Sequence, residues 1–562
     1  MPDRDANISV GELTAAFLEQ CGVTAAFGVI SIHNMPILDA FGRRAERAQA
    51  DGRPVPIRFV PARSESGAVN MADAHARVSG RLGVAVTSTG TAAGNACGAM
   101  VEALTAGTPL LHLTGQIGVP YLDQGLAYIH EAPEQLDMLK AVSKAAFRVR
   151  SAATALGTLR EAVRVAMTSP CGPVSVEIPI DIQSAKIAVP ASLAPAAVGV
   201  TAANTTELDH LAERLVHARR PLLWLGGGAR HAGQAARRLL DLGFGAVTSV
   251  QGRGVVAEED PRSLGAFNLY EPIERFYATC DAMLVVGSRL RSNETLMYKL
   301  KLPRPLMRID VDPRQQGRCY ADEQFVAADS ALALDGLADR LTGRMKVDPT
   351  FARDLAHARA AAESVVIDGL GPYGMLLAAL QRAAGRDFVW VRDVTVSNST
   401  WGNRSLSICG PRDGVHALGG GIGQGVQMAI GAALAAGSRK TLCLVGDGGL
   451  QVNIGELATM VQEHANVAII LMNDRGYGVI RNIQDAQYGG RRYFSDLHTP
   501  DFAQHAQSIG MPYRQVTDLT HVAQALAEVM AQQGPSLIEI DMNRIGPFAK
   551  HFAGPPVKDG RP

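Results

Sequence analysis

The stretch TLCLVGDGG, residues 441–449, places an acidic residue between glycines directly after a run of mostly apolar residues. A second apolar run, VAIILMND at residues 467–474, also ends in polar residues, Asn473 and Asp474. Apolar runs of this length, separated by a helical pattern, predict buried strands of a parallel sheet. Asp447 and Asp474 then fall at the carboxyl ends of two strands, which is where open α/β sheets bind ligands.

The residues around Asp447 suit a phosphate group and a divalent cation. Gly446, Gly448 and Gly449 let backbone N–H groups approach a phosphate closely, and a helix is expected just after them, at 454–462. Two carboxylates beside a phosphate offer the oxygen ligands that Mg²⁺ prefers. The structural alternative is two acids in ordinary strand-to-helix turns. The paired arrangement favours the ligand site.

Strands and helices alternate along the rest of the chain. Short, β-branched apolar runs separated by helical patterns predict mostly parallel sheets with helices on both faces. A stretch rich in Ala and Pro near residues 187–205 is typical of a linker. The chain has 562 residues, and domains usually contain roughly 100–200. We therefore expect an α/β protein of three domains, at residues 1–186, 200–345 and 370–562.

The composition excludes several classes of protein. Lys+Arg and Asp+Glu are equal at 54 each, so no net field favours nucleic acid or an anionic membrane as a partner. Hydrophobic residues make up 47% and charged residues 19%, which supports a large core and excludes wholesale disorder. The 7 cysteines are scattered, without a Cys-x-x-Cys pair, which argues against a disulfide framework or a structural zinc site.

Two uncharged segments come close to the composition of a membrane span, residues 82–101 and 414–438. Both are rich in Gly, Ser, Thr, Asn and Gln, whose polar groups would need partners in lipid. We interpret them as buried strand, loop and helix segments. The first residues, MPDRDANISV, lack the apolar stretch of a signal peptide. We therefore expect a cytoplasmic protein without a membrane partner.

GDG followed one strand later by Asn-Asp resembles the thiamine diphosphate motif. On these residues the chain resembles thiamine-diphosphate-dependent enzymes of the acetolactate synthase, benzoylformate decarboxylase and benzaldehyde lyase type, over essentially its whole length. The resemblance implies pyrimidine-binding, central and diphosphate-binding domains, in that order. It also implies that Mg²⁺ is bound by Asp447, Asp474 and the carbonyl of Gly476, while Gly448 and Gly449 donate to the diphosphate.

The segment GGGIG at residues 419–423 is similar to the family loop that bends the cofactor. Ile422 would lie between the two rings of the cofactor, and the carbonyl of Gly420 would accept from its amino group. A bent cofactor brings that nitrogen within reach of the reacting carbon. The alternative is a Gly-rich helix entry with Ile422 in the core. The further cofactor-binding residues that the resemblance implies are Gly446, Asn398 and Tyr477.

The stretch RSESGAVNMA at residues 63–72 resembles the family segment that carries a glutamate for the pyrimidine ring. Glu65 would protonate the ring nitrogen N1′, because a carboxyl in an apolar setting has a raised pKa. Ser64 stands where the family often has a histidine, which argues against the pyruvate decarboxylase subgroup. The alternative for Glu65 is a carboxylate that favours a helix N-terminus.

Three residues are candidates for contact with the substrate. His33 follows the first predicted strand, in a place where benzaldehyde lyase has a working histidine. Gln116 resembles a glutamine of acetolactate synthases that faces the substrate, and His130 follows in a segment similar to theirs. A lone histidine is more often structural than functional, so both interpretations of His33 and His130 stay open.

The central domain raises the question of a flavin. Residues 287–295 match the flavin-binding stretch of acetolactate synthases without its FDDR core, and the tryptophan expected after the second metal ligand is missing. Both departures argue against FAD and against a housekeeping acetolactate synthase. The segment Gly226–Gly228 suits either a phosphate or, as we favour, a turn at a strand end.

The resemblance predicts a thiamine-diphosphate- and Mg²⁺-dependent lyase or carboligase acting on a small molecule, a 2-oxo acid or an acyloin. The alternatives are an acetolactate-synthase-like carboligase, an FAD-linked 2-oxo acid oxidase and a non-catalytic paralogue. In this family the first domain of one subunit and the third domain of another hold one cofactor. The resemblance therefore implies a homodimer at minimum, and usually a homotetramer.

Overall fold

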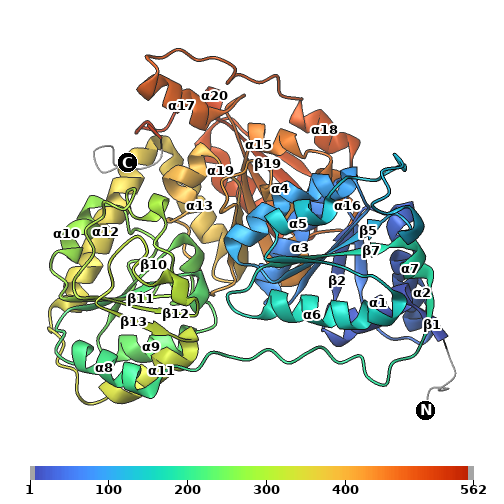
Figure 1. Cartoon of the computed structure of the whole chain (residues 1–562). Helices are drawn as coiled ribbons and strands as arrows, with labels where there is room; N and C mark the ends of the chain where they lie inside the picture. Colours follow the sequence, from blue (N-terminus) through green and yellow to red (C-terminus); the bar gives the residue numbers. More distant parts are fainter. Residues whose placement is uncertain (1–6, 555–562) are drawn as a thin grey trace. The chain divides into compact units, whose positions relative to one another are not determined.

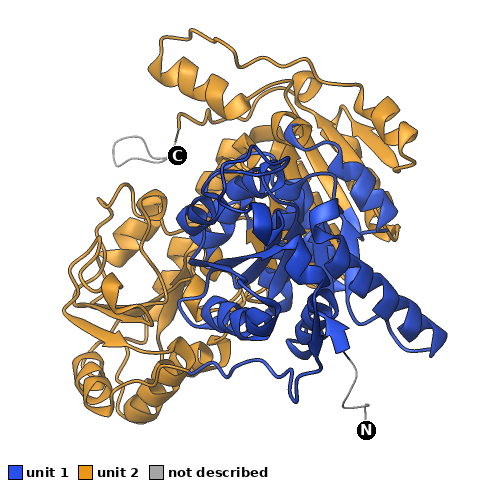
Figure 2. Ribbon diagram, turned by 45° about the vertical axis from the view of Figure 1, so that its right-hand side comes forward, with its two compact units in different colours: residues 1–199, 416–438, 452–467 blue, residues 200–415, 439–451, 468–562 orange. Residues whose placement is uncertain are grey.

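The computed structural model describes residues 7–554, and Figure 1 shows its helices and strands. Packing divides the chain into two compact units, drawn in blue and orange in Figure 2. The first unit contains residues 1–199, 416–438 and 452–467, and the second contains residues 200–415, 439–451 and 468–562. Each unit is therefore built from segments that are far apart in the sequence.

The first unit contains a sheet of six parallel strands in the order β3-β2-β4-β5-β7-β6. Strands β4, β5 and β7 are buried along their whole length, as expected for parallel strands covered on both faces. The strands are β2 (Ala25–Gly28), β3 (Arg58–Pro61), β4 (Gly83–Thr87), β5 (Leu110–Gln116), β6 (Ala145–Arg148) and β7 (Pro173–Pro179). A separate antiparallel pair joins β1 (Asn7–Ser9) to β8 (Lys186–Ala188).

Helices alternate with these strands. The first helix is stabilised by a capping box, in which Ser9 and Glu12 satisfy each other's backbone N–H groups. The helices are α1 (Val10–Gln20), α2 (Met35–Ala50), α3 (Glu65–Ser79), α4 (Thr91–Ala106), α5 (Gln135–Val142), α6 (Ala155–Met167) and α7 (Ile180–Ser184). Two helices from later in the chain, α14 (Gly425–Ala436) and α16 (Glu456–Gln462), belong to the same unit.

Helix α14 joins the first unit through close contact with α3. A Cβ at Gly431 would lie only 2.0 Å from the carbonyl oxygen of Met71, so no larger residue fits there without a shift. The uncharged segment 414–438 thus contains a short strand at 414–416, a loop and a buried helix, as predicted, but the loop is exposed at 419–422 instead of buried. This packing groups the chain differently from the three predicted domains, whose bounds stay predictions.

The second unit contains a five-stranded parallel sheet in the order β10-β9-β11-β12-β13. Its strands are β9 (Pro221–Leu225), β10 (Gly245–Thr248), β11 (Ala282–Val286), β12 (Leu306–Asp310) and β13 (Gln324–Ala327). The helices along it are α8 (Thr205–Leu215), α9 (Gly233–Asp241), α10 (Glu271–Tyr277) and α11 (Ser330–Leu341). The chain order reverses between β9 and β11, which is the usual ligand-binding edge of such a sheet.

A further sheet has six strands in the order β15-β14-β16-β17-β19-β18. The strands are β14 (Phe388–Arg392), β15 (Gly414–His416), β16 (Lys440–Gly446), β17 (Val467–Asn473), β18 (Tyr513–Val516) and β19 (Ser536–Asp541). The remaining helices are α12 (Phe351–Leu370), α13 (Gly374–Ala384), the π-helix η9 (Asn398–Gly402), α15 (Asp447–Val452), α17 (Gly478–Gln487), α18 (Phe502–Ser508), α19 (Val522–Ala531) and α20 (Met542–Ile545).

The predicted α/β fold with mostly parallel sheets flanked by helices is confirmed. The apolar runs of the sequence do not mark β1, β6, β8, β13, β15 and β18, each of which lies at the edge of its sheet. Edge strands are short and only partly buried, so they lack the continuous apolar run that marks a central strand. The predicted linker at 187–205 begins inside β8, and α8 follows it at Thr205.

One helical stretch of the described residues, Phe351–Ala384, is long and apolar enough to cross a membrane. It comprises α12 and α13, and 39% of its most apolar window is buried inside the protein. Leu355, Val366 and Leu376 on these helices lie in the hydrophobic core of the second unit. Part of the apolar surface of this stretch is therefore used in the core of the second unit.

Candidate active site

Asp447 and Asp474 lie at the ends of two neighbouring strands of the second unit. Asp447 directly follows β16, and Asp474 directly follows β17. The carboxylate of Asp447 is fully buried and accepts the backbone N–H of Asp474 at 3.2 Å through Oδ1. Its Oδ2 accepts the backbone N–H of Gly476 at 2.8 Å. The structure thus brings together the three residues predicted as metal ligands.

The electrostatics of this pair suit a divalent cation. Burial raises the pKa of both carboxyl groups, and at Asp447 the nearby charge of Asp474 raises it further. A cation between the two carboxylates would offset their repulsion and their desolvation. The carbonyl oxygen of Gly476 lies 3.3 Å from where a Cβ of Gly448 would be, so it also faces this turn. This all-oxygen donor set fits Mg²⁺.

The glycines of this site are required by close contacts. A Cβ at Gly448 would lie 2.8 Å from the ring of Tyr477, and one at Gly478 would lie 2.0 Å from Oδ2 of Asp474. The helix predicted at 454–462 is wrong in its start. Helix α15 begins at Asp447 itself, and α16 begins only at Glu456. The first N–H groups of a helix lack partners within it, so those of Gly448 and Gly449 can donate to a phosphate.

Asn398 and Tyr477 lie near the same turns. Asn398 begins the π-helix η9, and its backbone N–H donates to Oγ1 of Thr395 at 2.9 Å. A methyl group of Thr395 lies 3.4 Å from where a Cβ of Gly446 would be. The side-chain oxygen of Asn398 is buried without a hydrogen-bond partner among the described residues. The contacts of Asn398 and Tyr477 with a cofactor stay predictions.

Glu65 lies in the first unit as the first residue of α3. Ser64 caps this helix, because its hydroxyl accepts the backbone N–H of Gly67 at 3.0 Å. Oε2 of Glu65 accepts from Nδ2 of Asn95 at 3.1 Å. Within this unit the side chain of Glu65 is half-buried rather than enclosed. Its predicted role toward a pyrimidine nitrogen stays a prediction.

The sequence analysis missed Glu456, which holds the start of α3. Its Oε1 accepts the backbone N–H groups of Arg63 and Ser64 at 3.0 Å each, and also the hydroxyl of Ser64 at 3.1 Å. The hydroxyl of Thr459 donates to its Oε2 at 2.6 Å. A glutamate inside a helix gives no local sign of such partners. Only its burial, at 1% exposed, distinguishes Glu456 from a surface residue.

The Gly-rich segment 419–423 is held by a second glutamate that the sequence analysis missed. Glu102 on α4 accepts the backbone N–H groups of Leu418 at 2.8 Å and Gly419 at 2.6 Å. Gly420 has a φ of 82°, which favours glycine. Ile422 is 39% exposed, so within this unit it projects outward instead of packing in the core. This exposure fits a side chain that supports a ligand.

A buried ion-pair network supports Glu102. Arg77 donates to Glu102 at 2.9 Å and forms an ion pair with Asp73 at 2.5 Å. Its Nη1 also donates to the carbonyl of His416 at 2.8 Å, just before the Gly-rich segment. All three charged side chains are buried. The network therefore holds the Glu102 side chain on α4 and also the backbone at His416, where the chain enters the loop.

His33 and His130 lie against each other in the first unit. Their ring centroids are 5.2 Å apart, with an interplanar angle of 72°. His33 is 6% exposed, and burial, then the nearby His130, lowers its pKa. The carbonyl oxygen of His130 lies 2.3 Å from where a Cβ of Gly90 would be. Two of the three candidate substrate residues are therefore together.

Gln116 is 1% exposed at the end of β5, and protein groups occupy its amide. Its Oε1 accepts from the hydroxyl of Thr89 at 3.0 Å and from the backbone N–H of Ile117 at 2.8 Å. Its Nε2 lies 3.4 Å from Oε2 of Glu177, to which Gln135 also donates at 3.0 Å. These contacts give Gln116 a structural role, and its substrate contact stays a prediction.

The turn at Gly226–Gly228 is occupied by its own sheet. The backbone N–H groups of Gly226 and Gly228 donate to the carbonyls of Val286 and Gly287 at 2.8 Å and 3.0 Å. A Cβ at Gly226 would lie 2.1 Å from the carbonyl oxygen of Gly287. These glycines therefore serve the close approach of two strand ends, which is the interpretation favoured from the sequence.

Comparison with known families gives matches along most of the chain. Three models of the thiamine pyrophosphate enzymes match it: the N-terminal TPP binding domain at residues 8–141, the central domain at 208–337 and the C-terminal TPP binding domain at 393–540. The matches follow the order expected from the sequence.

Three curated proteins illustrate the similarity. The probable 2-ketoarginine decarboxylase AruI of Pseudomonas aeruginosa is 30% identical over 95% of this chain and 94% of its own length. The acetolactate synthase isozyme 1 large subunit of Escherichia coli (strain K12) is 26% identical over 94% of this chain and 93% of its own length. The probable chloroplastic acetolactate synthase 2 of Oryza sativa subsp. japonica is 27% identical, covering 94% of this chain and 82% of its own length.

Proposed function

We propose that this chain, which belongs to the thiamine pyrophosphate enzyme family, is a Mg²⁺-dependent lyase that decarboxylates a 2-oxo acid. The observation that carries the proposal is the contact of Asp447 with the backbone of Asp474 and Gly476 at two strand ends. The name of the decarboxylase relative supports a 2-oxo acid as the substrate class. When bound, thiamine diphosphate supplies the carbanion-stabilising chemistry that this decarboxylation needs.

The residues of the second unit would bind the diphosphate end of the cofactor. Asp447, Asp474 and the carbonyl of Gly476 would hold Mg²⁺, and the N–H groups of Gly448 and Gly449 would donate to the phosphate oxygens. The buried carboxylates lose their mutual repulsion when the cation is present. Cation and diphosphate therefore bind together.

The residues of the first unit would act at the pyrimidine end. Glu65 would hold a proton at the ring nitrogen N1′, as a general acid in hydrogen-bond reach does. Glu456 fixes the backbone on which Glu65 stands, through the N–H groups of Arg63 and Ser64. Ile422 would support the bent cofactor from a loop that Glu102 holds in place. Two buried glutamates thus hold the backbone just before Glu65 and the loop that carries Ile422.

Ligation is the second candidate activity. The acetolactate synthases among the relatives favour a carboligase. After loss of CO₂, a decarboxylase adds a proton to the remaining carbanion, whereas a carboligase adds a second substrate to it. We propose that the enzyme acts without FAD, because the N–H groups of Gly226 and Gly228 are already bound by β11 and the residue after it. An oxidase would be yellow with bound flavin, and a non-catalytic paralogue would have no turnover.

We also propose that the working form is at least a homodimer in the cytoplasm. Exposed apolar side chains lie on two segments, residues 30–35 and 126–130, which are in contact through the rings of His33 and His130. They are 48% to 71% exposed and comprise Ile30, Ile32, Met35, Leu126 and Ile129. A second copy would cover them, and Ile129→Glu should then raise the monomer fraction in light scattering. A fully active Ile129→Glu monomer would contradict this.

A panel of 2-oxo acids tests the proposed activity. The purified enzyme is assayed for CO₂ release and for C–C ligation in separate experiments, each with and without thiamine diphosphate and Mg²⁺. We expect turnover only when both are present, and loss of turnover after treatment with a chelator. Full turnover without either one would overturn the proposal, as would failure of every 2-oxo acid tested.

A further inference from the structure

Arg392, the last residue of β14, is buried with two of its three guanidinium nitrogens lacking a partner in the described part of the chain. It is 1% exposed, and its Nε and Nη1 make no hydrogen bond with any described residue. A buried charge without a partner is costly, and an arginine keeps its proton in proteins. Burial, followed by the nearby Arg253 guanidinium, lowers the pKa of Arg392 well below its ordinary value.

The carboxylate near Arg392 is already occupied. Glu258 accepts two hydrogen bonds of 2.7 Å from Arg253, one on each oxygen. It also accepts the backbone N–H of Ile408 at 2.9 Å. Arg253 and Glu258 are themselves buried, at 2% each. The oxygens of Glu258 therefore accept hydrogen bonds from Arg253 and Ile408, and none from Nε or Nη1 of Arg392.

Two further arginines contribute positive charge at the same place. Arg230 and Arg404 both disfavour the charge of Arg392, whereas Glu258 favours it. Arg404 lies with its guanidinium 5.5 Å from the ring centroid of Tyr270, and its buried Nε has no partner. The charges of Arg230, Arg253 and Arg404 thus all act against that of Arg392.

An unpartnered indole N–H adds to these donors. Trp390 shares a face of β14 with Arg392, because alternate residues of a strand point the same way. The rings of Trp390 and Trp401 stack with centroids 6.0 Å apart, and the buried Nε1 of Trp401 has no partner. Trp390 donates to the carbonyl of Gly402 at 2.8 Å, to which Arg253 also donates at 3.4 Å. The end of β14, η9 and Arg253 therefore meet.

We propose that Arg392, Arg404 and Trp401 form a binding site for a phosphate-type oxyanion. The unpartnered guanidinium and indole atoms are all donors, and an oxyanion is a ligand that only accepts. Its two negative charges would offset the excess of guanidinium groups. The N–H groups of Gly226 and Gly228 play no part, since they are bound within the sheet. The phosphate is either inorganic phosphate or the phosphate of a larger molecule.

Thermal unfolding of the holoenzyme tests this site. The enzyme is saturated with thiamine diphosphate and Mg²⁺, so that the diphosphate site is filled, and sodium phosphate is compared with sodium chloride at equal ionic strength. At a phosphate concentration about 100-fold above its dissociation constant, we expect Tm to rise by roughly 2–4 °C. A parallel titration with ADP distinguishes the two sources, because a nucleotide site would respond at a far lower concentration of ADP than of phosphate.

Arg392→Met should remove the phosphate-dependent rise, because it deletes the central donor while keeping an apolar side chain of similar length. Arg275→Met is the matched control, since the side chain of Arg275 is 70% exposed and its removal should leave the rise unchanged. If Arg392→Met does not fold, calorimetric titration of the wild-type holoenzyme with phosphate takes its place. The absence of both binding heat and a Tm rise overturns the proposal, as does a rise that persists in Arg392→Met. Neither readout depends on turnover, so failure here is separate from failure of the proposed reaction.

Discussion

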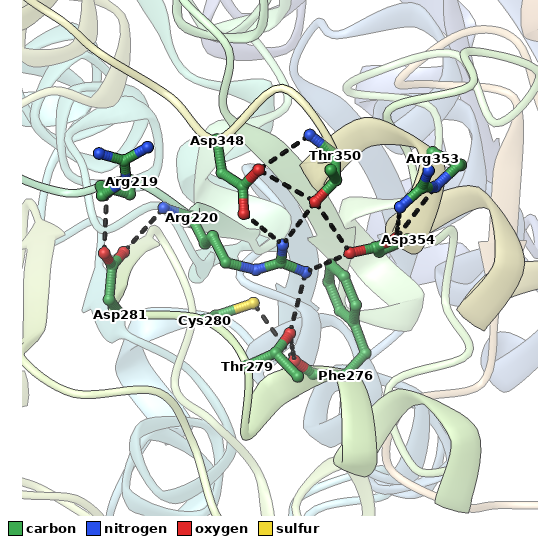
Figure 3. A network of polar contacts seen from close by, with 10 residues as sticks. All are labelled: Arg219, Arg220, Phe276, Thr279, Cys280, Asp281, Asp348, Thr350, Arg353 and Asp354. Atoms are coloured by element: carbon green, nitrogen blue, oxygen red, sulfur yellow. Dashed lines mark hydrogen bonds and ion pairs between the residues drawn. The ribbon is translucent and has the colours of Figure 1, made fainter.

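Two charged clusters of the second unit differ in how their charges are balanced. In the cluster of Figure 3, the guanidinium of Arg220 donates to Asp348 at 2.9 Å and to Asp354 at 3.1 Å. Two threonine hydroxyls complete the contacts around it. At Asp447, by contrast, the nearest titratable partner is another carboxylate, that of Asp474.

The balanced charges of the Arg220 cluster indicate a structural role, whereas the unbalanced carboxylates at Asp447 and Asp474 indicate a ligand site. Arg220 precedes β9, and its two carboxylates lie just before and within α12, so the cluster ties a strand to a helix without any ligand. The guanidinium also lies 5.1 Å from the ring centroid of Phe351, which adds apolar contact. The carboxylates at Asp447 need a cation from outside the chain. Buried charges without a counter-charge in the chain therefore indicate a ligand site. Asp447 and Asp474 are such a case with negative charge, and Arg392 is one with positive charge.

Breaking the unbalanced cluster should have the largest effect. Asp447→Ala should abolish binding of thiamine diphosphate, because the diphosphate loses its Mg²⁺ bridge. Titration calorimetry with Mg²⁺ present measures the affinity. The fold should survive, since the change removes a buried charge without a counter-ion. Wild-type affinity in Asp447→Ala would remove Asp447 from the cofactor site.

Glu65 extends the comparison to the first unit. Its only hydrogen-bond partner among the described residues is Asn95, so its charge is also unbalanced within the unit. Glu65→Gln should bind the cofactor but lose roughly 10²–10⁴ in rate, because an amide cannot protonate the pyrimidine nitrogen. Exchange of the cofactor's thiazolium C2 proton with solvent, followed by NMR, measures this step. Exchange at the wild-type rate in Glu65→Gln would contradict the role of Glu65 as the acid that protonates the pyrimidine nitrogen.

Breaking the balanced cluster should cost stability and spare the chemistry. Arg220→Met should lower the free energy of unfolding by about 1–3 kcal/mol, because two carboxylates and two hydroxyls lose a donor. Denaturant unfolding and turnover are measured on the same preparation. Arg219→Met is the matched control, since the side chain of Arg219 is exposed and only its backbone takes part. Its N–H donates to Asp281 at 2.8 Å, and its carbonyl accepts the N–H of Asp348 at 2.8 Å. A variant with normal stability and lost activity would reverse the comparison.

The Arg220 cluster also predicts a pH dependence. The backbone N–H of Thr350, followed by Arg220, lowers the pKa of Asp348 to about 2. A carboxyl with a lowered pKa stabilises the fold above the unfolded value of about 3.9, and this contribution is lost as the pH falls through about 2. The stability difference between wild type and Arg220→Met should therefore shrink between about pH 4 and pH 2. A constant difference over that range would contradict the ion pairs.

His33 tests the smallest expected effect. Its imidazole ring lies against that of His130, and burial, followed by the charge of His130, lowers the pKa of His33. The neutral imidazole can accept a proton from the substrate near neutral pH. His33→Ala should then reduce turnover at least tenfold while Tm and cofactor affinity stay near wild type. If turnover per folded site is unchanged and stability falls by about 1–3 kcal/mol, His33 is only structural.

Most of the metal half of the site could be predicted from the sequence, because its signal is local. An acid between glycines after an apolar run marks a strand end with a tight turn, and this holds at Asp447 whatever the rest of the chain does. Asp474 follows its own strand in the same way. Sheet topology then places the two turns side by side, since β16 and β17 are neighbours.

The supporting glutamates could not be predicted, because their partners are distant in the sequence. Glu456 binds the backbone of Arg63 and Ser64, and Glu102 binds the backbone of Leu418 and Gly419. Backbone N–H groups leave no trace in a sequence, and a glutamate in a helix is usually exposed. Gln116 shows the opposite case, because the amide expected to face a substrate is bound by the protein itself.

The sequence by itself determined the α/β class, the central strands, and the turns that carry Asp447 and Asp474. Buried parallel strands need continuous apolar runs, and close turns need glycine, so both are properties of a short stretch of residues. Only the tertiary structure decided the edge strands β6, β13, β15 and β18, and the membership of α14 in the first unit. It also left Arg392 without a counter-ion. Edge pairing, helix packing and charge balance depend on which segments meet, and that is decided by contacts between residues far apart in the chain.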